Sequence, residues 1–146
     1  MPSAPDPSFD PARAGHLVAA HGHNRILGAR FLGYGPDWAE LAIDWREELV
    51  GDEATGVLAS GPIIALMDMA TGMAVWVRRG VFRPQATLDL RVDYLRGAKL
   101  GATVIGRGEC YRITRRIAFV RGQAHDGDPA DPIAHVAGTF MFTDVE

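Results

Sequence analysis

The sequence predicts a single α+β domain in which an antiparallel sheet packs against one long helix. Residues 60–79 have the length and continuous apolar character of a buried helix. Most of the flanking segments alternate apolar and polar residues with a period of two, which is typical of strands with one wet face. A chain of 146 residues that is 47% hydrophobic suits one packed core. No internal repeat divides the sequence, so we expect one domain at 11–146 after a disordered or frayed tail at 1–10.

The part before the long helix is expected to hold a short helix and two strands. Residues 11–20 fit a short helix, and residues 25–35 and 38–45 fit strands. The glycine- and proline-bearing stretch at 33–37 predicts the turn between these strands. The acidic, glycine-bearing stretch at 47–56 predicts a loop that leads into the long helix.

The ends of the long helix carry the residues that usually start and stop one. Ser60 or Gly61 is a natural N-cap, and Pro62 fits the first turn. Gly80 suits the stop. Between residues 63 and 77 the only strongly polar side chain is Asp68, so we expect most of the helix surface to be buried.

Four more strands are expected after the helix. The first alternates throughout, which places Thr87 on the same face as Asp89. The second and third are separated by a short turn and predict a hairpin. A long helix among six strands must lie against their sheet, and consecutive strands favour antiparallel pairing. The four strands are at 85–95, 102–113, 116–125 and 133–142.

The charges are distributed unevenly along the chain. Residues 78–121 hold 11 basic and 3 acidic residues, whereas the remainder holds 4 basic and 15 acidic residues. Such asymmetry is typical of a segment that meets an anionic ligand. The alternative is that arginines happen to occupy the solvated faces of strands, and charge alone leaves the two interpretations even.

Asp68 is the candidate for chemistry. An ionised carboxylate among apolar neighbours must be paired, hydrogen-bonded, neutral or open to a cleft. It can act as a general base or nucleophile, or it can pair with an arginine at a subunit interface. Thr71, one turn later, can orient a water molecule or the carboxylate, or bond back to the helix backbone. Thr87 supplies a second candidate hydroxyl or is simply a strand-forming residue.

Two motifs give the chain a resemblance to a known family. Leu66-Met67-Asp68 lies in the helix, with glycine at position 72, and the strand 87–96 reads Thr-Leu-Asp-Leu-Arg-Val-Asp-Tyr-Leu-Arg. Together with Gly56, these residues resemble the PaaI-like acyl-CoA thioesterases, and the resemblance extends over about residues 25–143. It implies the hotdog fold, in which an antiparallel six-stranded sheet wraps around one long central helix.

The resemblance also implies an activity and its residues. The expected reaction is hydrolysis of an acyl-CoA or related thioester to the free acid and coenzyme A. Asp68 would act as base or nucleophile, the N–H of Ser60 or Gly61 would polarise the thioester carbonyl, and Thr87 would position water. No cofactor or metal is required beyond the coenzyme A of the substrate, and a homodimer or homotetramer with sites between subunits is expected. The candidates for substrate binding are Thr71, Arg91, Arg96, Arg115 and Arg116.

The segment before the helix departs from the family pattern. The family has Asn-x-x-Gly-x-x-His-Gly-Gly, but here Glu53 stands at the asparagine, Ala59 at the histidine and Ser60 at the first glycine. The leading alternative is therefore a non-catalytic hotdog protein that binds acyl-CoA or a similar ligand. A dehydratase of the same fold is a second alternative, although no histidine lies near Asp68 in sequence.

Other functional classes find little support. His21 and His23 lack further ligands in a metal-binding pattern, and Cys110 alone fits a small core residue. The basic half lacks the interleaved aromatic residues of a nucleic-acid platform. Neither a membrane-spanning run nor a signal peptide is expected, so the default is a cytoplasmic protein that binds neither nucleic acid nor membrane.

Overall fold

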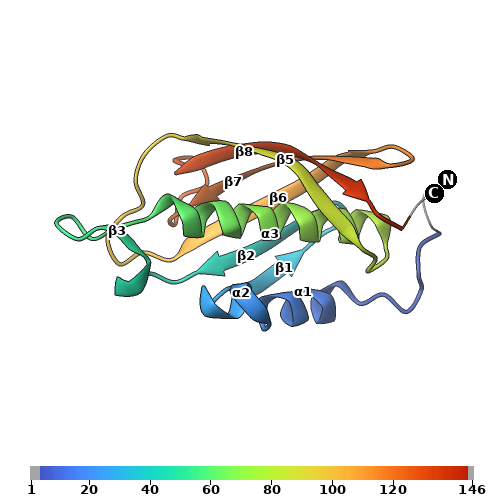
Figure 1. Cartoon of the computed structure of the whole chain (residues 1–146), viewed down its shortest axis with the longest axis horizontal. Coiled ribbons are helices and arrows are strands. Elements are labelled where there is room, and N and C mark those ends of the chain that lie inside the picture. The colour runs from blue at the N-terminus through green and yellow to red at the C-terminus, as the bar shows by residue number, and fades with distance from the viewer. Residues whose placement is uncertain (1–3, 145–146) are drawn as a thin grey trace.

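A six-stranded antiparallel sheet packs against helix α3 (Ser60–Arg79) in the computed structural model, which describes residues 4–144 (Figure 1). The strand order is β1-β2-β6-β7-β8-β5, so β1 and β5 form the edges. This arrangement is the hotdog fold, and it confirms the predicted class. The other elements are α1 (Pro11–Ala19), α2 (Gly22–Ile26), β1 (Arg30–Tyr34), β2 (Trp38–Ile43), a 3-10 turn (Glu47–Leu49), β3 (Val50–Asp52), β4 (Val57–Leu58), β5 (Gln85–Tyr94), β6 (Val104–Ile113), β7 (Ile117–His125) and β8 (Ala134–Phe142).

Helix α3 begins one residue earlier than its capping residues predicted. Ala59 is the N-cap and its side chain caps nothing, so Ser60 and Gly61 already belong to the helix. The stop at Gly80 is confirmed, because Gly80 adopts the left-handed conformation at φ 67° and its N–H donates to the carbonyls of Trp76 and Val77. By length and composition α3 could cross a membrane, but 56% of its apolar window is buried inside the protein.

The helix approaches the sheet at backbone distance. Leu66, Met67 and Ala70 are completely buried on the face that meets the sheet. Opposite them, β6 carries Gly108, where an added Cβ would lie 2.5 Å from the backbone carbonyl of Ala70. Glycine is therefore required at this point for the helix to pack as closely as it does.

Strand β5 contains a β-bulge that the alternating sequence did not predict. The pairing register with β8 shifts between Thr87 and Asp89. These two residues are separated by Leu88 in β5, whereas their partners, Phe140 and Thr139, are adjacent in β8. Thr87 is paired with the buried Phe140, whereas Asp89 is paired with Thr139 on the other face. The prediction that Thr87 and Asp89 share a face was therefore wrong. The bulge turns Thr87 toward α3, a typical effect of bulges beside functional sites.

Local elements before α3 also differ from expectation. The predicted loop at 47–56 contains the short strand β3, which pairs with β4 in a small sheet at the N-terminal end of α3 (Figure 1). The first predicted strand begins later, at Arg30, because α2 occupies residues 22–26. Within the predicted N-terminal tail at 1–10, the backbone N–H of Asp6 donates to the carbonyl of Gly80 at 2.8 Å, which attaches this part of the chain to the end of α3.

The close packing at Gly108 yields a stability prediction. Gly108→Ala should lower the free energy of unfolding by about 1–3 kcal/mol, since the new methyl group meets helix backbone that has little freedom to move. Urea denaturation would measure the change. Gly33→Ala is the matched control, because no atom lies within 4 Å of its added Cβ. Equal effects of the two substitutions would contradict the packing argument.

Candidate active site

Asp68 and Thr87 form the centre of the candidate site. Asp68 is half-buried on α3, and the hydroxyl of Thr87 donates to its Oδ1 at 2.7 Å. In the described part of the chain no lysine or arginine pairs with this carboxylate. The threonine fixes one oxygen and leaves the other as an acceptor, an arrangement suited to a general base or nucleophile.

Thr71 bonds back to its own helix. Its side chain is fully buried, and its hydroxyl donates to the carbonyl of Met67 at 2.7 Å. The sequence left several roles open for Thr71, and the structure shows the one in which its hydroxyl bonds back to the helix backbone.

The N-terminus of α3 exposes backbone donors. The first four N–H groups of a helix lack acceptors within the helix, and Ala59 at the N-cap has no side-chain oxygen to satisfy them. Ser60 and Gly61 are both exposed there. The hydroxyl of Tyr94 donates to the carbonyl of Ser60 at 3.1 Å, which holds this end of the helix against the end of β5. The exposed N–H groups and the helix dipole favour an anion or a polarised carbonyl.

The two parts of the candidate site are far apart within one chain. Asp68 follows Ser60 by eight residues, which corresponds to about 12 Å along the helix axis. One thioester carbonyl cannot contact both groups of the same helix.

Arg96 is engaged inside the protein. It forms two hydrogen bonds of 2.7 and 2.8 Å with the carboxylate of Asp126 and a third, of 2.7 Å, with the carbonyl of Asp131. The side chain of Asp126 has no exposed surface, and the guanidinium beside it holds its pKa well below the usual range. Arg96 therefore ties the end of β5 to the loop after β7.

The four arginines expected to bind substrate do not converge within one subunit. Arg91 lies on the exposed edge strand beside Asp93, with an Nε–Oδ1 distance of 3.1 Å. Arg115 and Arg116 lie in the turn after β6, whereas Arg96 lies in the segment that leads into the start of β6. The ten-residue length of β6 therefore separates Arg96 from the other two arginines. Ten residues of strand span about 33 Å.

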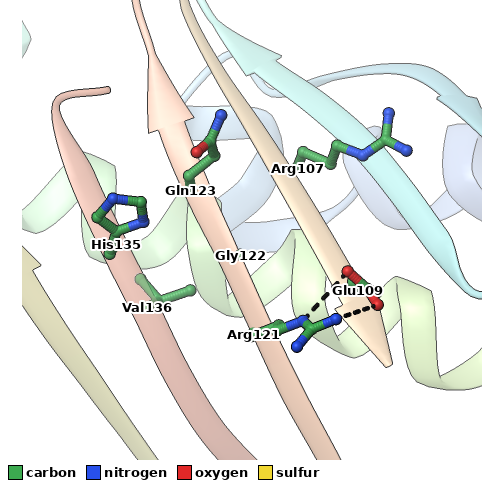
Figure 2. A pocket seen from close by; sticks show the side chains of 7 residues that line it. All are labelled: Arg107, Glu109, Arg121, Gly122, Gln123, His135 and Val136. Atoms are coloured by element: carbon green, nitrogen blue, oxygen red, sulfur yellow. Dashed lines mark hydrogen bonds and ion pairs between the residues drawn. The ribbon is translucent and has the colours of Figure 1, made fainter. Parts of the chain in front are cut away.

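The outer face of the sheet contains a hollow of about 370 Å³ whose arginines have partners nearby (Figure 2). Arg121 pairs with Glu109 at 2.9 Å. Arg107 pairs with Glu40 at 3.2 Å and lies 3.8 Å above the ring of Trp38. The hollow lies on the opposite side of the sheet from Asp68.

Ion pairs between the basic segment and the rest of the chain account for part of the uneven charge distribution. Arg79, Arg96 and Arg107 belong to the basic segment, and each pairs with an acidic residue from outside it. Part of the asymmetry therefore reflects pairing within the fold.

Cys110 does not compete as a nucleophile. It is completely buried, and burial raises the pKa of its thiol to about 11. A thiol in this environment stays protonated near neutral pH.

A groove extends from Asp68 along α3 and has a volume of about 220 Å³. We call it the Asp68 groove. Sequence reasoning missed its walls, because they come from α1, α2, α3, β5 and β8 and share no motif. Its lining residues are Val18, Asn24, Asp68, Met69, Gly72, Met73, Trp76, Gln85 and Phe140.

The fold and the carboxylate on its central helix define a class of hydrolase. Residues 55–133 match the model of the thioesterase superfamily, so the chain belongs to this superfamily. The chain is 30% identical to the medium/long-chain acyl-CoA thioesterase YigI of Salmonella typhimurium, over 81% of this chain and 83% of the relative. YigI of Escherichia coli is 29% identical with the same coverage.

Solved structures agree with this assignment. A Pseudomonas aeruginosa protein has a TM-score of 0.82 at 33% identity, covering 90% of this chain and 98% of the other. A mutant of the phenylacetic acid degradation protein PaaI from Thermus thermophilus has a TM-score of 0.69 at 27% identity, covering 81% and 96%. The resemblance seen in the sequence is thus confirmed, and the chain is an enzyme of the thioesterase class.

Thr87 should be needed for turnover. Thr87→Val removes the hydrogen bond to Asp68 and should lower kcat about 10- to 100-fold with a smaller change in KM. Thr87→Ser keeps the hydroxyl and should restore most of the loss. Steady-state hydrolysis of a thioester substrate measures both. A valine variant with the turnover of the wild-type protein would show that the hydrogen bond to Asp68 is not needed.

The buried pair of Arg96 and Asp126 should make stability depend on pH. Because folding lowers the pKa of Asp126, its contribution is complete above the unfolded value of about 4 and is lost as the pH falls toward the folded value. Asp126→Asn should cost about 3 kcal/mol at pH 7 and clearly less at pH 2. Urea denaturation at both pH values tests this. The exposed Asp93→Asn should change stability by less than about 1 kcal/mol.

Proposed function

We propose that this protein hydrolyses medium- or long-chain acyl-CoA thioesters to the free acid and coenzyme A. The observation that carries the proposal is the Asp68–Thr87 pair on the central helix of a thioesterase-superfamily fold. The YigI relatives, which are named medium/long-chain acyl-CoA thioesterases, support the substrate class.

In the proposed mechanism, Asp68 provides the base or nucleophile and Thr87 holds it. An N–H group at Ser60 or Gly61 donates to the thioester oxygen and stabilises the charge that develops in the transition state. If Asp68 acts as a base, it takes a proton from water while the oxygen of that water attacks the carbonyl carbon. The carbon–sulfur bond then breaks, and the coenzyme A thiolate leaves.

We infer that each site combines two subunits. Asp68 and Ser60 of one helix are about 12 Å apart, so the N–H donor beside a given Asp68 has to come from a second copy. Strand β5 supports this assembly, because it is a ten-residue edge strand with one side unpaired within the subunit. Leu88, Tyr94 and Leu95 at this edge are exposed, as expected of residues that a second copy covers.

The arginines have a limited role in this proposal. Arg91, Arg115 and Arg116 remain candidates for the phosphates of coenzyme A if a second subunit brings them near one another. For Arg96 we propose a structural role, because most of its donors bind Asp126 and Asp131.

The non-catalytic alternative rests on the replacement of the family histidine by Ala59. Replacement of the histidine by alanine removes an imidazole side chain but keeps the backbone N–H donors of the helix. Alanine at the N-cap has no side-chain oxygen to accept hydrogen bonds from these N–H groups, so they stay uncapped. These points favour turnover over binding alone.

Asp68→Asn should reduce hydrolysis at least about 100-fold while preserving the fold. The measurement uses acetyl-, octanoyl-, palmitoyl- and phenylacetyl-CoA with thiol detection, and calorimetry of free coenzyme A alongside. Binding without turnover by the wild-type protein would favour the non-catalytic alternative. Equal turnover by the wild-type and variant proteins would remove Asp68 from the mechanism.

Hybrid oligomers test the shared site. Ser60→Pro deletes one N–H, and proline is tolerated at the first helical position. Asp68→Asn should be inactive alone, and so should Ser60→Pro when the Ser60 N–H is the donor to the thioester oxygen. A hybrid containing one subunit of each should recover about half the wild-type activity, because one site then carries both defects and the other carries neither. No recovery in a purified, doubly tagged hybrid would contradict the two-subunit site.

A further inference from the structure

Three hydrogen bonds join one face of α3 to the start of β5 and the chain just before it. We call this set of bonds the α3–β5 clamp. The bonded pairs are Asp68 with Thr87 at 2.7 Å, Gly72 with Gln85 at 2.8 Å and Trp76 with Arg83 at 2.7 Å. The start of β5 accordingly lies beside the C-terminal half of α3 (Figure 1). The clamp therefore connects the candidate base to two further contacts along the same helix face.

The spacing of the clamp follows from helix and strand geometry. Its helix residues are four apart, which is about 6 Å along the axis, and its strand-side residues are two apart, which is about 6.7 Å of extended chain. These nearly equal steps allow three bonds to form in one register, with each set of residues on one face of its element. A slip of β5 by one residue would turn Thr87 and Gln85 away from the helix. The register of the clamp thus decides whether Thr87 faces Asp68.

Apolar packing alone does not fix this register. The helix packs mainly on β2 and β6, whereas β5 is an edge strand that pairs with β8. The contact at Gly108 sets the separation of helix and sheet, but it does not hold β5 along the helix axis. Thr87 is itself exposed within the subunit, so no apolar contact encloses it. The hydrogen bonds of the clamp therefore align β5 with α3.

Gln85 provides the middle bond of the clamp and leaves a buried acceptor unpaired. Its Nε2 donates to the carbonyl of Gly72, and a carbonyl can only accept, so the NH2 group must face the helix. The Oε1 of Gln85 is then buried without a hydrogen-bond partner among the described residues, which lowers stability. The carbonyl of Gly72 lies inside α3, where the bond to the residue four positions later already satisfies it. Stability alone would therefore be served as well by an apolar side chain at position 85.

We propose that Gln85 is a positioning residue for the hydrolysis reaction. Its amide holds β5 in register on α3 and thereby keeps the hydroxyl of Thr87 on the carboxylate of Asp68. The inference rests on the proposed thioesterase function and adds a residue that acts on Asp68 only through Thr87.

Gln85→Met keeps the length of the side chain and removes the amide. With octanoyl-CoA, kcat should fall about 5- to 20-fold while KM stays within about twofold, because the misaligned hydroxyl affects the reacting carboxylate. The urea midpoint should stay the same or rise, since the unpaired acceptor is removed together with the hydrogen bond.

Gln123→Met is the matched control for this substitution. Gln123 is a half-buried strand residue whose Nε2 also donates to a backbone carbonyl, that of Pro129 at 2.9 Å, but it lies on the outer face of the sheet. Its kcat should stay within about twofold of the wild-type value. Wild-type kcat in Gln85→Met would overturn the proposal, and so would a loss of kcat no larger than the loss of folded protein.

A double-mutant cycle tests whether Gln85 acts through Thr87. In a Thr87→Val background, Gln85→Met should lower kcat by less than about twofold further, because the hydrogen bond that the amide aligns is already absent. If the two losses multiply, Gln85 acts by another route and the proposal is wrong.

A crystal structure of Gln85→Met separates failure of the clamp from failure of the proposed activity. The distance from Thr87 Oγ1 to Asp68 Oδ1 should lengthen from 2.7 Å to beyond about 3.5 Å, or Thr87 should occupy more than one rotamer. Either result supports the clamp even if the wild-type protein hydrolyses no acyl-CoA. A single Thr87 conformer at the wild-type distance would reject the positioning role, whatever the kinetics show.

Discussion

The contact between helix α3 and strand β6 at Gly108 is the constraint on which the rest of the structure depends. At this point the backbone of the helix meets the strand with no side chain between them. Close packing buries the apolar face of α3, and Asp68 is the only strongly polar side chain between residues 63 and 77 of this helix. It also fixes how far α3 lies from β5 and β8, and thus whether Thr87 reaches the carboxylate and whether a groove remains beside it.

The sequence predicted the parts of the fold that follow from periodicity and end residues. The buried helix, its stop at Gly80 and the four strands after it all have local causes. The bulge in β5 has no such cause, because the residues from Thr87 to Asp93 alternate without interruption. A bulge depends on the neighbouring strand and on the hydrogen bond that Thr87 donates to Asp68, and neither can be read from one segment.

The pairing of charged residues also depends on parts of the chain that are far apart in the sequence. An excess of arginines in one segment predicts an anionic ligand only if the arginines lack partners within the protein. Arg96 and Asp126 are 30 residues apart, and only the folding of β5 beside β8 and of β8 beside β7 brings them together. Asp68 could be singled out from sequence because its local neighbours made burial costly. The groove could not, since its walls come from five elements whose residues are unremarkable one by one.

The altered segment before α3 has a different meaning once its geometry is known. In a helix with serine, threonine or aspartate at the N-cap, the side-chain oxygen accepts a hydrogen bond from one of the free N–H groups of the first turn. Ala59 cannot do so, and the first N–H groups stay available to a ligand. Losing the family histidine removes one means of ordering the thioester, but Tyr94 still holds the carbonyl of Ser60 against β5. Because β5 also carries Thr87, one edge strand contacts both Asp68 and, through Tyr94, the first turn of α3. Pairing of two subunits along β5 would therefore assemble both halves of each site at once.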